Sequence, residues 1–274
     1  MLCRVMGVSR SGFYDYEKRM DQDPDPDHLD LVEMVRNISD SSDHTYGARR
    51  MSRALKALGY EIGRRRARTL MREAGIWVRY RKKYRVTTNS RHSHPVFPNR
   101  LERNFRMERP NQAWVGDITY LWTHEGWLYL AVVIDLYSRK IVGWSMSQRI
   151  NARLACDAFQ MAIWSRRPEE GMIFHSDRGV QYASHEFRGL LKANGILGSM
   201  SRKGDCWDNS VVESFFGKLK SERAHWRNYQ TRSEARADIV QYITMRHNSL
   251  RLHSYLDYLS PDEFERRGQL AKAA

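Results

Sequence analysis

The stretch that decides the fold is residues 114–134, WVGDITYLWTHEGWLYLAVVI. It holds two apolar or alternating runs, 114–121 and 127–134, separated by polar and turn residues, and a third run follows at 141–146. Each run is typical of a β-strand. Further along, the periodicity predicts helices at 151–166, 184–193 and 210–220 and short strands at 171–175 and 196–200. Three strands followed by alternating helices and strands predict an α/β domain with a mixed sheet.

The composition is that of an ordinary globular protein. The 274 residues are 41% apolar and 28% charged, which gives ample length for a buried core. The longest apolar run, 128–134, is far shorter than the roughly 20 residues of a spanning helix, and the N-terminus has no secretory pattern. Three distant cysteines without a C-x-x-C motif argue against disulfides and a cysteine zinc site. We therefore expect a cytoplasmic protein without a membrane partner.

Positive charge is concentrated in one quarter of the chain. The whole chain has a net charge of +14, whereas residues 45–110 alone hold nineteen Lys or Arg and four Asp or Glu, a net of +15. A basic block dominated by arginine favours a polyanionic partner, most often nucleic acid. A solvated basic face is the plain alternative.

Three amphipathic helices are expected in and just before this basic block. Apolar residues recur at helical spacing in 31–38, 51–58 and 67–71, and the third helix leaves a row of arginines outside. These are Arg64, Arg65, Arg66 and Arg68. The pattern predicts a helix-turn-helix DNA-binding domain at 28–80, with the third helix in a major groove. Periodicity alone also fits a plain helical bundle.

Two flanking segments are less regular. Residues 1–20 resemble the end of another helix-turn-helix module, with a turn at 6–9 and a helix from Ser11, although a short isolated N-terminal helix fits as well. Residues 81–110 form a basic linker that either tracks a phosphate backbone or is an exposed tether. Its cations are interleaved with tyrosine. We name Arg81, Lys82, Lys83 and Arg85 as its candidate DNA-binding residues.

Three acidic residues are placed where metal chemistry would need them. Asp117 lies inside an apolar strand, Asp177 follows a strand and precedes Gly179, and Glu213 lies on an apolar helix. Singly, each is more often a surface or ion-paired carboxylate. Together, three carboxylates at the ends of separate elements can hold two divalent ions for in-line phosphoryl transfer. Lys220 lies seven positions after Glu213 on the same helical face and can reach a bound phosphate.

Four blocks of sequence closely resemble retroviral-integrase-like transposases, specifically the second-frame (OrfB) transposases of the IS-three family of bacterial insertion sequences. They are WVGDITYL, AVVIDLYSRKIVGW, HSDRGVQY and SRKGDCWDNSVVESFFGKLKSE. The resemblance covers almost the whole chain, and its most specific element is the spacing of 35 residues between Asp177 and Glu213.

The resemblance implies a ribonuclease-H-like integrase catalytic core at 111–230 with a C-terminal helical tail at 231–274. It implies that Asp117, Asp177 and Glu213 bind two Mg²⁺ or Mn²⁺ ions and act as a DDE polynucleotidyl transferase. It further implies DNA partners, namely the terminal repeats of the element and target DNA, and a nucleoid-associated location in a bacterium. The upstream-frame OrfA product, free or fused, and a homo-oligomer on DNA are the expected protein partners.

Several acidic and polar residues, and the function itself, have alternative interpretations. Asp205 and Asp208 are alternative ligands, although neither keeps the spacing. Asp135 either orients a metal ligand without contacting the ion or, more simply, is a structural carboxylate at a strand end. His175 and Gln181 orient bound water or DNA, or only make loop hydrogen bonds. As functions, a non-catalytic DNA-binding regulator and an RNA-cleaving ribonuclease H are the alternatives to a transposase, and the arginine-rich helix argues against the latter.

Overall fold

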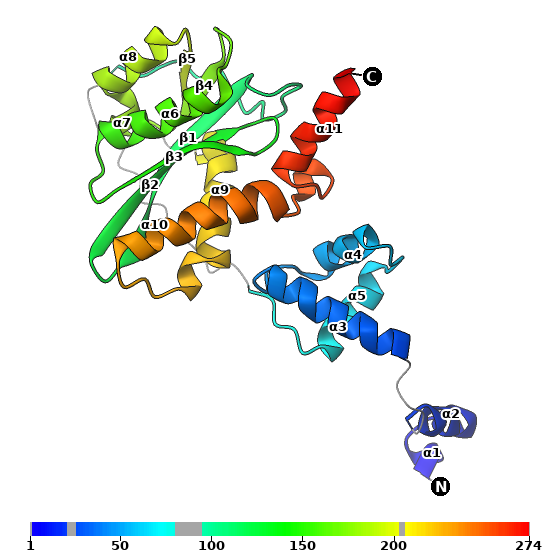
Figure 1. Cartoon of the computed structure of the whole chain (residues 1–274). Coiled ribbons are helices and arrows are strands. Elements are labelled where there is room, and N and C mark those ends of the chain that lie inside the picture. The colour runs from blue at the N-terminus through cyan, green and yellow to red at the C-terminus, as the bar shows by residue number, and fades with distance from the viewer. Residues whose placement is uncertain (1, 21–25, 80–94, 203–205, 274) are drawn as a thin grey trace. The chain divides into compact units, whose positions relative to one another are not determined.

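The computed structural model describes residues 2–20, 26–79, 95–202 and 206–273 (Figure 1). The chain divides into two compact units, Met1–Val78 and Arg79–Ala274. The first is helical and the second contains the sheet.

The helical unit contains α1 (Leu2–Val5), α2 (Arg10–Met20), α3 (Pro26–Ser41), α4 (Ala48–Ala57) and α5 (Arg64–Glu73). Helices α3, α4 and α5 share one small core. Its fully buried members include Val35, Met51, Leu55 and Ala67. These are positions that the helical spacing assigned to the inside, so the three predicted helices are confirmed.

The second unit is built on a five-stranded mixed sheet in the order β3-β2-β1-β4-β5. The central strands are long and antiparallel: β1 (Ala113–Thr123) pairs with β2 (Gly126–Asp135), which pairs with β3 (Ile141–Ser147). The strands β4 (Ile173–Ser176) and β5 (Leu197–Met200) continue the sheet parallel to β1. All five strands were predicted, and the mixed sheet is confirmed.

Helices cover both faces of the sheet (Figure 1). On one face, α6 (Ala152–Arg166), α7 (Val180–Ala183) and α8 (His185–Ala193) pack on alternate residues of β1 and β2 such as Trp114 and Val133. On the other face, α9 (Ser210–Glu222) and α10 (Arg232–Gln241) pack on the intervening residues such as Val115 and Val132. This alternation follows from the two-residue period of a strand.

The remaining elements are short turns and the C-terminal helices. The 3₁₀ turn η1 (Cys206–Asn209) precedes α9, and η2 (Ala224–Trp226) follows it. Helix α10 runs into a π-helical segment, η3 (Tyr242–Leu250), and the chain ends with η4 (Ser254–Leu256) and α11 (Pro261–Ala273). No helix within the described ranges has both the length and the apolar character to cross a bilayer.

Candidate active site

Asp117 lies in the middle of β1, on the sheet face that α9 covers. Its neighbours on that face, Ala113 and Val115, are fully buried. Oδ1 of Asp117 accepts a hydrogen bond of 2.7 Å from the N–H of Ile118, which orients the carboxylate. The preceding residue is glycine for a steric reason, because a Cβ at Gly116 would lie 2.5 Å from Cζ of Phe174. The W-V-G-D motif thus packs an aromatic ring on one face and presents a carboxylate on the other.

Parallel pairing brings Asp177 beside Asp117. The last paired residues of β1 and β4 are Gly116 and Ser176, so the two aspartates are the next residues along neighbouring parallel strands. Oδ1 of Asp177 accepts a 2.9 Å hydrogen bond from the N–H of Gly179. A Cβ at Gly179 would approach that oxygen to 3.0 Å, so glycine leaves room for the turn. Asp177 is therefore held at the carboxyl end of β4, as predicted.

Glu213 lies on α9, the helix that covers the sheet face containing Asp117. It lies in the first turn of α9, whose Val212, Phe215 and Leu219 are buried against the sheet. Burial of this stripe places α9 over the face of β1 that contains Asp117. The three acids thus come from a strand, a strand end and a helix.

The pKa of Asp117 shows that these groups interact. Burial raises this pKa well above the usual carboxyl value, and the negative charges of Asp177 and then Glu213 raise it further. The hydrogen bond from Ile118 and the charge of Lys220 oppose the rise. Without a cation, three ionised carboxylates at this site repel one another, and a divalent ion would relieve that repulsion.

Lys220 lies two turns along α9 from Glu213, as its spacing predicted. Its side chain is mostly buried, and Nζ lies 4.7 Å from the centroid of the Tyr120 ring. Burial lowers the pKa of Lys220, while the charge of Asp117 raises it. The lysine therefore interacts electrostatically with Asp117.

Tyr182 on α7 also interacts with the acids, and no motif in the sequence indicated it. Burial raises the pKa of its phenol, and so do the charges of Asp117 and Asp177. The ring packs against Phe174 and Phe187. Its aromatic character predicts a core position, and only the fold reveals that this position borders the acids.

In the described ranges, no three histidine, cysteine, aspartate or glutamate side chains stand in an arrangement that could already hold a metal ion. The structure brings the acids into electrostatic contact without closing a metal cage. Their chemistry nevertheless suits a hard divalent cation, since carboxylate oxygens are the preferred ligands of Mg²⁺ and Mn²⁺.

The alternative acids have other partners. Asp208 is buried and accepts hydrogen bonds from Asn99 and Arg103. Asp135 is buried at the end of β2 and forms an ion pair with Arg166. This geometry supports the interpretation of Asp135 as a structural carboxylate. Asp205 lies outside the described residues.

His175 is a core residue. It is fully buried, with Nδ1 2.8 Å from Oγ of Ser199 and Nε2 3.2 Å from Oγ of Ser201, and burial lowers its pKa to about 4. Of its two predicted roles, the hydrogen-bonding one is what the geometry supports.

The arginines predicted to read DNA lie together on the exposed side of α5. Arg64, Arg65, Arg66 and Arg68 are all exposed, and no acidic residue stands in the first turn of that helix. The linker candidates Arg81, Lys82, Lys83 and Arg85 lie outside the described residues.

Comparison with known proteins gives the family. An integrase core domain matches residues 107–206, a second integrase core domain matches 213–268, and an HTH-like domain matches 26–84. The "Transposase InsF for insertion sequence IS3A" of Escherichia coli (strain K12) is 43% identical, over 97% of this chain and 93% of the relative. The chain belongs to the IS3 family of transposases.

A second relative of this IS3-family transposase is the "Insertion element IS600 uncharacterized 31 kDa protein" of Shigella sonnei. It is 41% identical over 97% of this chain and 98% of its own length. Among solved structures, a simian T-cell lymphotropic virus intasome is similar at 17% identity and a TM-score of 0.49, over 86% of this chain and 74% of that one.

The family confirms the predicted fold, a ribonuclease-H-like integrase core that follows a helical HTH-like domain in the sequence. An integrase core of this kind is a polynucleotidyl transferase, and an HTH-like domain binds DNA.

Proposed function

We propose that this IS3-family transposase binds the ends of its insertion sequence and catalyses metal-dependent DNA strand cleavage and strand transfer at a site formed by Asp117, Asp177 and Glu213. The principal support is the shared electrostatic environment of the three carboxylates, in which Asp177 and Glu213 raise the pKa of Asp117. Side chains that repel one another in this way cost stability, and a catalytic metal site is a common reason for such a cost.

Two Mg²⁺ or Mn²⁺ ions bound by these acids would supply activation of the attacking oxygen and charge neutralisation on the attacking and leaving oxygens of an in-line displacement. The chain's own groups hold the acids ready: the N–H groups of Ile118 and Gly179 orient Asp117 and Asp177. Lys220, beside Asp117, would contact the phosphate as a cation.

DNA recognition is assigned to the first unit and the linker. Arg64, Arg65 and Arg66 occupy the first turn of α5, the positive end of the helix dipole, where cations are unfavourable. A bound phosphate would compensate for this placement. We assign phosphate and base contacts to these residues and Arg68, and phosphate contacts to Arg81, Lys82, Lys83 and Arg85.

Protein partners follow from the reaction. Strand transfer requires two element ends to be held together, so we propose that the protein acts as a homo-oligomer on DNA. We also propose that the upstream-frame OrfA product, free or fused to this chain, takes part in the complex.

The test is strand cleavage on a denaturing gel. The chain, alone and fused to its upstream frame, is incubated with labelled duplexes of its element ends and Mg²⁺ or Mn²⁺. We expect nicking and joining that require the metal and vanish in Glu213→Gln, while DNA binding persists. The control is Glu186→Gln, an exposed acid on α8, which should retain full activity.

Two outcomes would contradict the proposal. DNA binding without cleavage by either form would indicate a non-catalytic regulator. Preferential cutting of an RNA–DNA hybrid would indicate a ribonuclease.

A further inference from the structure

Asp208, five residues before Glu213, is a buried acid that accepts three hydrogen bonds, and the proposed reaction does not use it. Its side chain is only 1% exposed. Oδ2 accepts hydrogen bonds of 3.0 Å from Nδ2 of Asn99 and 3.0 Å from the N–H of Arg202, and Oδ1 accepts one of 2.9 Å from Nε of Arg103. The Arg202 guanidinium lies 3.6 Å from Oδ2. One carboxylate thus joins segments that are about a hundred residues apart in sequence.

This carboxylate is ionised in the folded protein. Burial alone would favour its neutral form, but hydrogen bonds from the Arg202 N–H and the Arg103 guanidinium, and the charges of both arginines, lower the pKa of Asp208 below its usual value. A buried carboxylate that accepts three hydrogen bonds and lies beside two cations holds the surrounding segments together strongly.

The segment that Asp208 holds, residues 95–103, is called the strap below. It lies along β5: the Phe97 ring occupies the space above Gly198, where a Cβ would come within 2.6 Å of the ring. Arg188 of α8 stacks over the same ring at 4.7 Å and donates a hydrogen bond to the carbonyl of Pro95. Leu101 is buried in the core beneath α9.

The strap is also linked to β4 through Ser199 of β5. Oγ of Ser199 accepts hydrogen bonds from the N–H groups of Arg100 (2.9 Å) and Leu101 (3.3 Å). The same Oγ lies 2.8 Å from Nδ1 of His175, two residues before Asp177. At its other end the strap holds Asp208, five residues before Glu213. The strap therefore supports two of the three chain segments that contain proposed metal ligands, those of Asp177 and Glu213.

We propose that Asp208 is a positioning residue for Glu213. By fastening η1 to the strap, it fixes the start of α9, so that the Glu213 carboxylate stays near Asp117 and Asp177 and can share a metal ion with them. This inference rests on the proposed function. Asp208 would act by orienting a metal ligand and not by contact with the ion.

The test compares Mg²⁺ titrations of strand cleavage for the wild type, Asp208→Asn and Asp208→Glu, each with its Tm. Asn keeps the size of the side chain but removes the charge and one acceptor. We expect Asp208→Asn to raise the Mg²⁺ concentration for half-maximal cleavage about 10-fold and to lower the maximal rate 10- to 100-fold, the usual range for groups that orient metal ligands. Asp208→Glu should restore part of both losses.

A matched control separates positioning from stability. Asp238 on α10 is a largely buried acid that is also paired with an arginine, Arg223. Among the described residues its hydrogen-bond partners, Arg223 and Tyr229, lie outside the strap. Asp238→Asn should lower Tm without changing the Mg²⁺ dependence. Arg103→Met removes the Arg103–Asp208 ion pair from the side of Arg103, a half-exposed residue whose loss folding should tolerate. This variant should raise the half-maximal Mg²⁺ concentration as Asp208→Asn does.

The outcomes are distinguishable. If Asp208→Asn and Arg103→Met titrate with Mg²⁺ as the wild type does, while Glu213→Gln is inactive, the positioning role is wrong and the proposed function stands. If the wild type shows no metal-dependent cleavage, or Glu213→Gln cleaves normally, the proposed function itself fails.

Discussion

At the scale of single residues, Asp117 shows how function can oppose stability. Its carboxylate lies in an apolar strand beside Asp177, and burial followed by that neighbouring charge raises its pKa well above the usual value. A raised pKa in the folded state means that the ionised form destabilises the fold. This cost is complete above the folded-state pKa of Asp117, falls as the pH drops through that pKa, and disappears below the pKa of the unfolded chain.

We therefore expect Asp117→Asn to stabilise the metal-free protein. Asn can still accept the Ile118 hydrogen bond, and it removes the repulsion, so Tm at pH 7 should rise by roughly 2–4 °C, the shift that about 1 kcal/mol gives a protein of this size. Thermal unfolding with and without Mg²⁺ tests this. Mg²⁺ should raise the Tm of the wild type and leave the variant unchanged. A metal-free variant that melts below the wild type would contradict this reading.

At the scale of elements, α5 combines a poor charge arrangement at one end with a good one at the other. Arg64, Arg65 and Arg66 stand in its first turn, and Arg72 stands in its last, where a cation is favourable. No side chain caps its N-terminus. A phosphate bound at this uncapped helix N-terminus would neutralise the three cations and so stabilise α5.

Opposite substitutions in α5 should therefore have opposite effects. Arg65→Glu should raise the free energy of unfolding of the helical unit by about 0.3–1 kcal/mol and weaken DNA binding, with a salt dependence reduced by about one unit of slope per lost phosphate contact. Arg72→Glu should destabilise the unit by a similar amount. Urea unfolding and DNA titrations at several salt concentrations measure both. If Arg65→Glu binds DNA as the wild type does, α5 is not the recognition helix.

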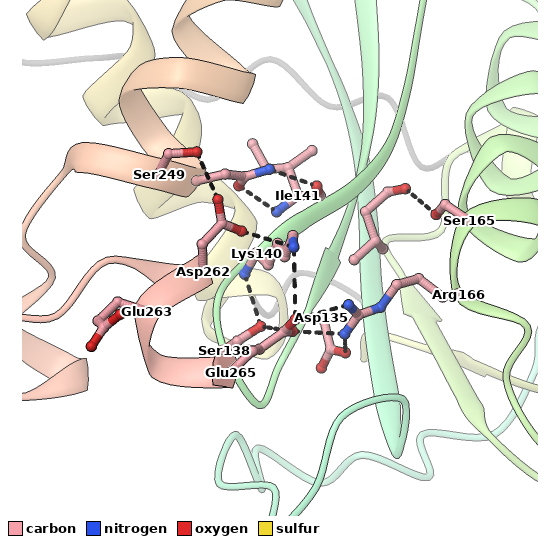
Figure 2. Close-up of polar contacts among 12 residues, drawn as sticks. Asp135, Ser138, Lys140, Ile141, Ser165, Arg166, Ser249, Asp262, Glu263 and Glu265 are labelled. Atoms are coloured by element: carbon pink, nitrogen blue, oxygen red, sulfur yellow. Dashed lines mark hydrogen bonds and ion pairs between the residues drawn. The ribbon is translucent and has the colours of Figure 1, made fainter. Parts of the chain in front are cut away.

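At the scale of the whole sheet-containing unit, an ionic network anchors the C-terminal helix α11 (Figure 2). The Arg166 guanidinium on α6 donates hydrogen bonds of 2.6 and 2.8 Å to the two oxygens of Glu265 and one of 3.1 Å to Asp135 at the end of β2. Oγ of Ser138 donates a further bond of 2.6 Å to Glu265. Three elements from distant parts of the sequence meet at one carboxylate.

Loss of the Glu265 charge should weaken the attachment of α11 to the rest of the unit. Burial opposes ionisation of Glu265, yet the Arg166 and Ser138 hydrogen bonds lower its pKa below the usual value, so its stabilisation is present at neutral pH and lost as pH falls through the folded-state pKa. Glu265→Gln should cost about 3–5 kcal/mol at pH 7 and progressively less in acid. Urea unfolding across pH measures this difference. The charge of Glu263 pairs along the helix surface with Arg266 and Arg267, so Glu263→Gln should change stability little. Equal effects of the two variants would contradict the network's role.

Local pattern predicted most of this architecture. The strands were expected at 114–121 and 127–134 and extend over 113–123 and 126–135, because alternation identifies a strand but hydrogen-bond pairing decides where it ends. The relation of Asp117 to Asp177 was foreseeable from their places at strand positions. The ion pair between Asp208 and Arg103 could not be predicted, because contacts between residues a hundred positions apart follow from packing and leave no periodic signal.

The central claim is that Asp117, Asp177 and Glu213 together bind the catalytic metal, and metal position is its most direct measurement. Crystals of the wild type and of Asp177→Asn soaked in Mn²⁺ would be compared in anomalous difference maps. We predict Mn²⁺ peaks bridging the three carboxylates in the wild type and their loss in the variant. Peaks at other acids such as Asp208, or no peak among the three at a Mn²⁺ concentration that supports strand transfer, would contradict the account.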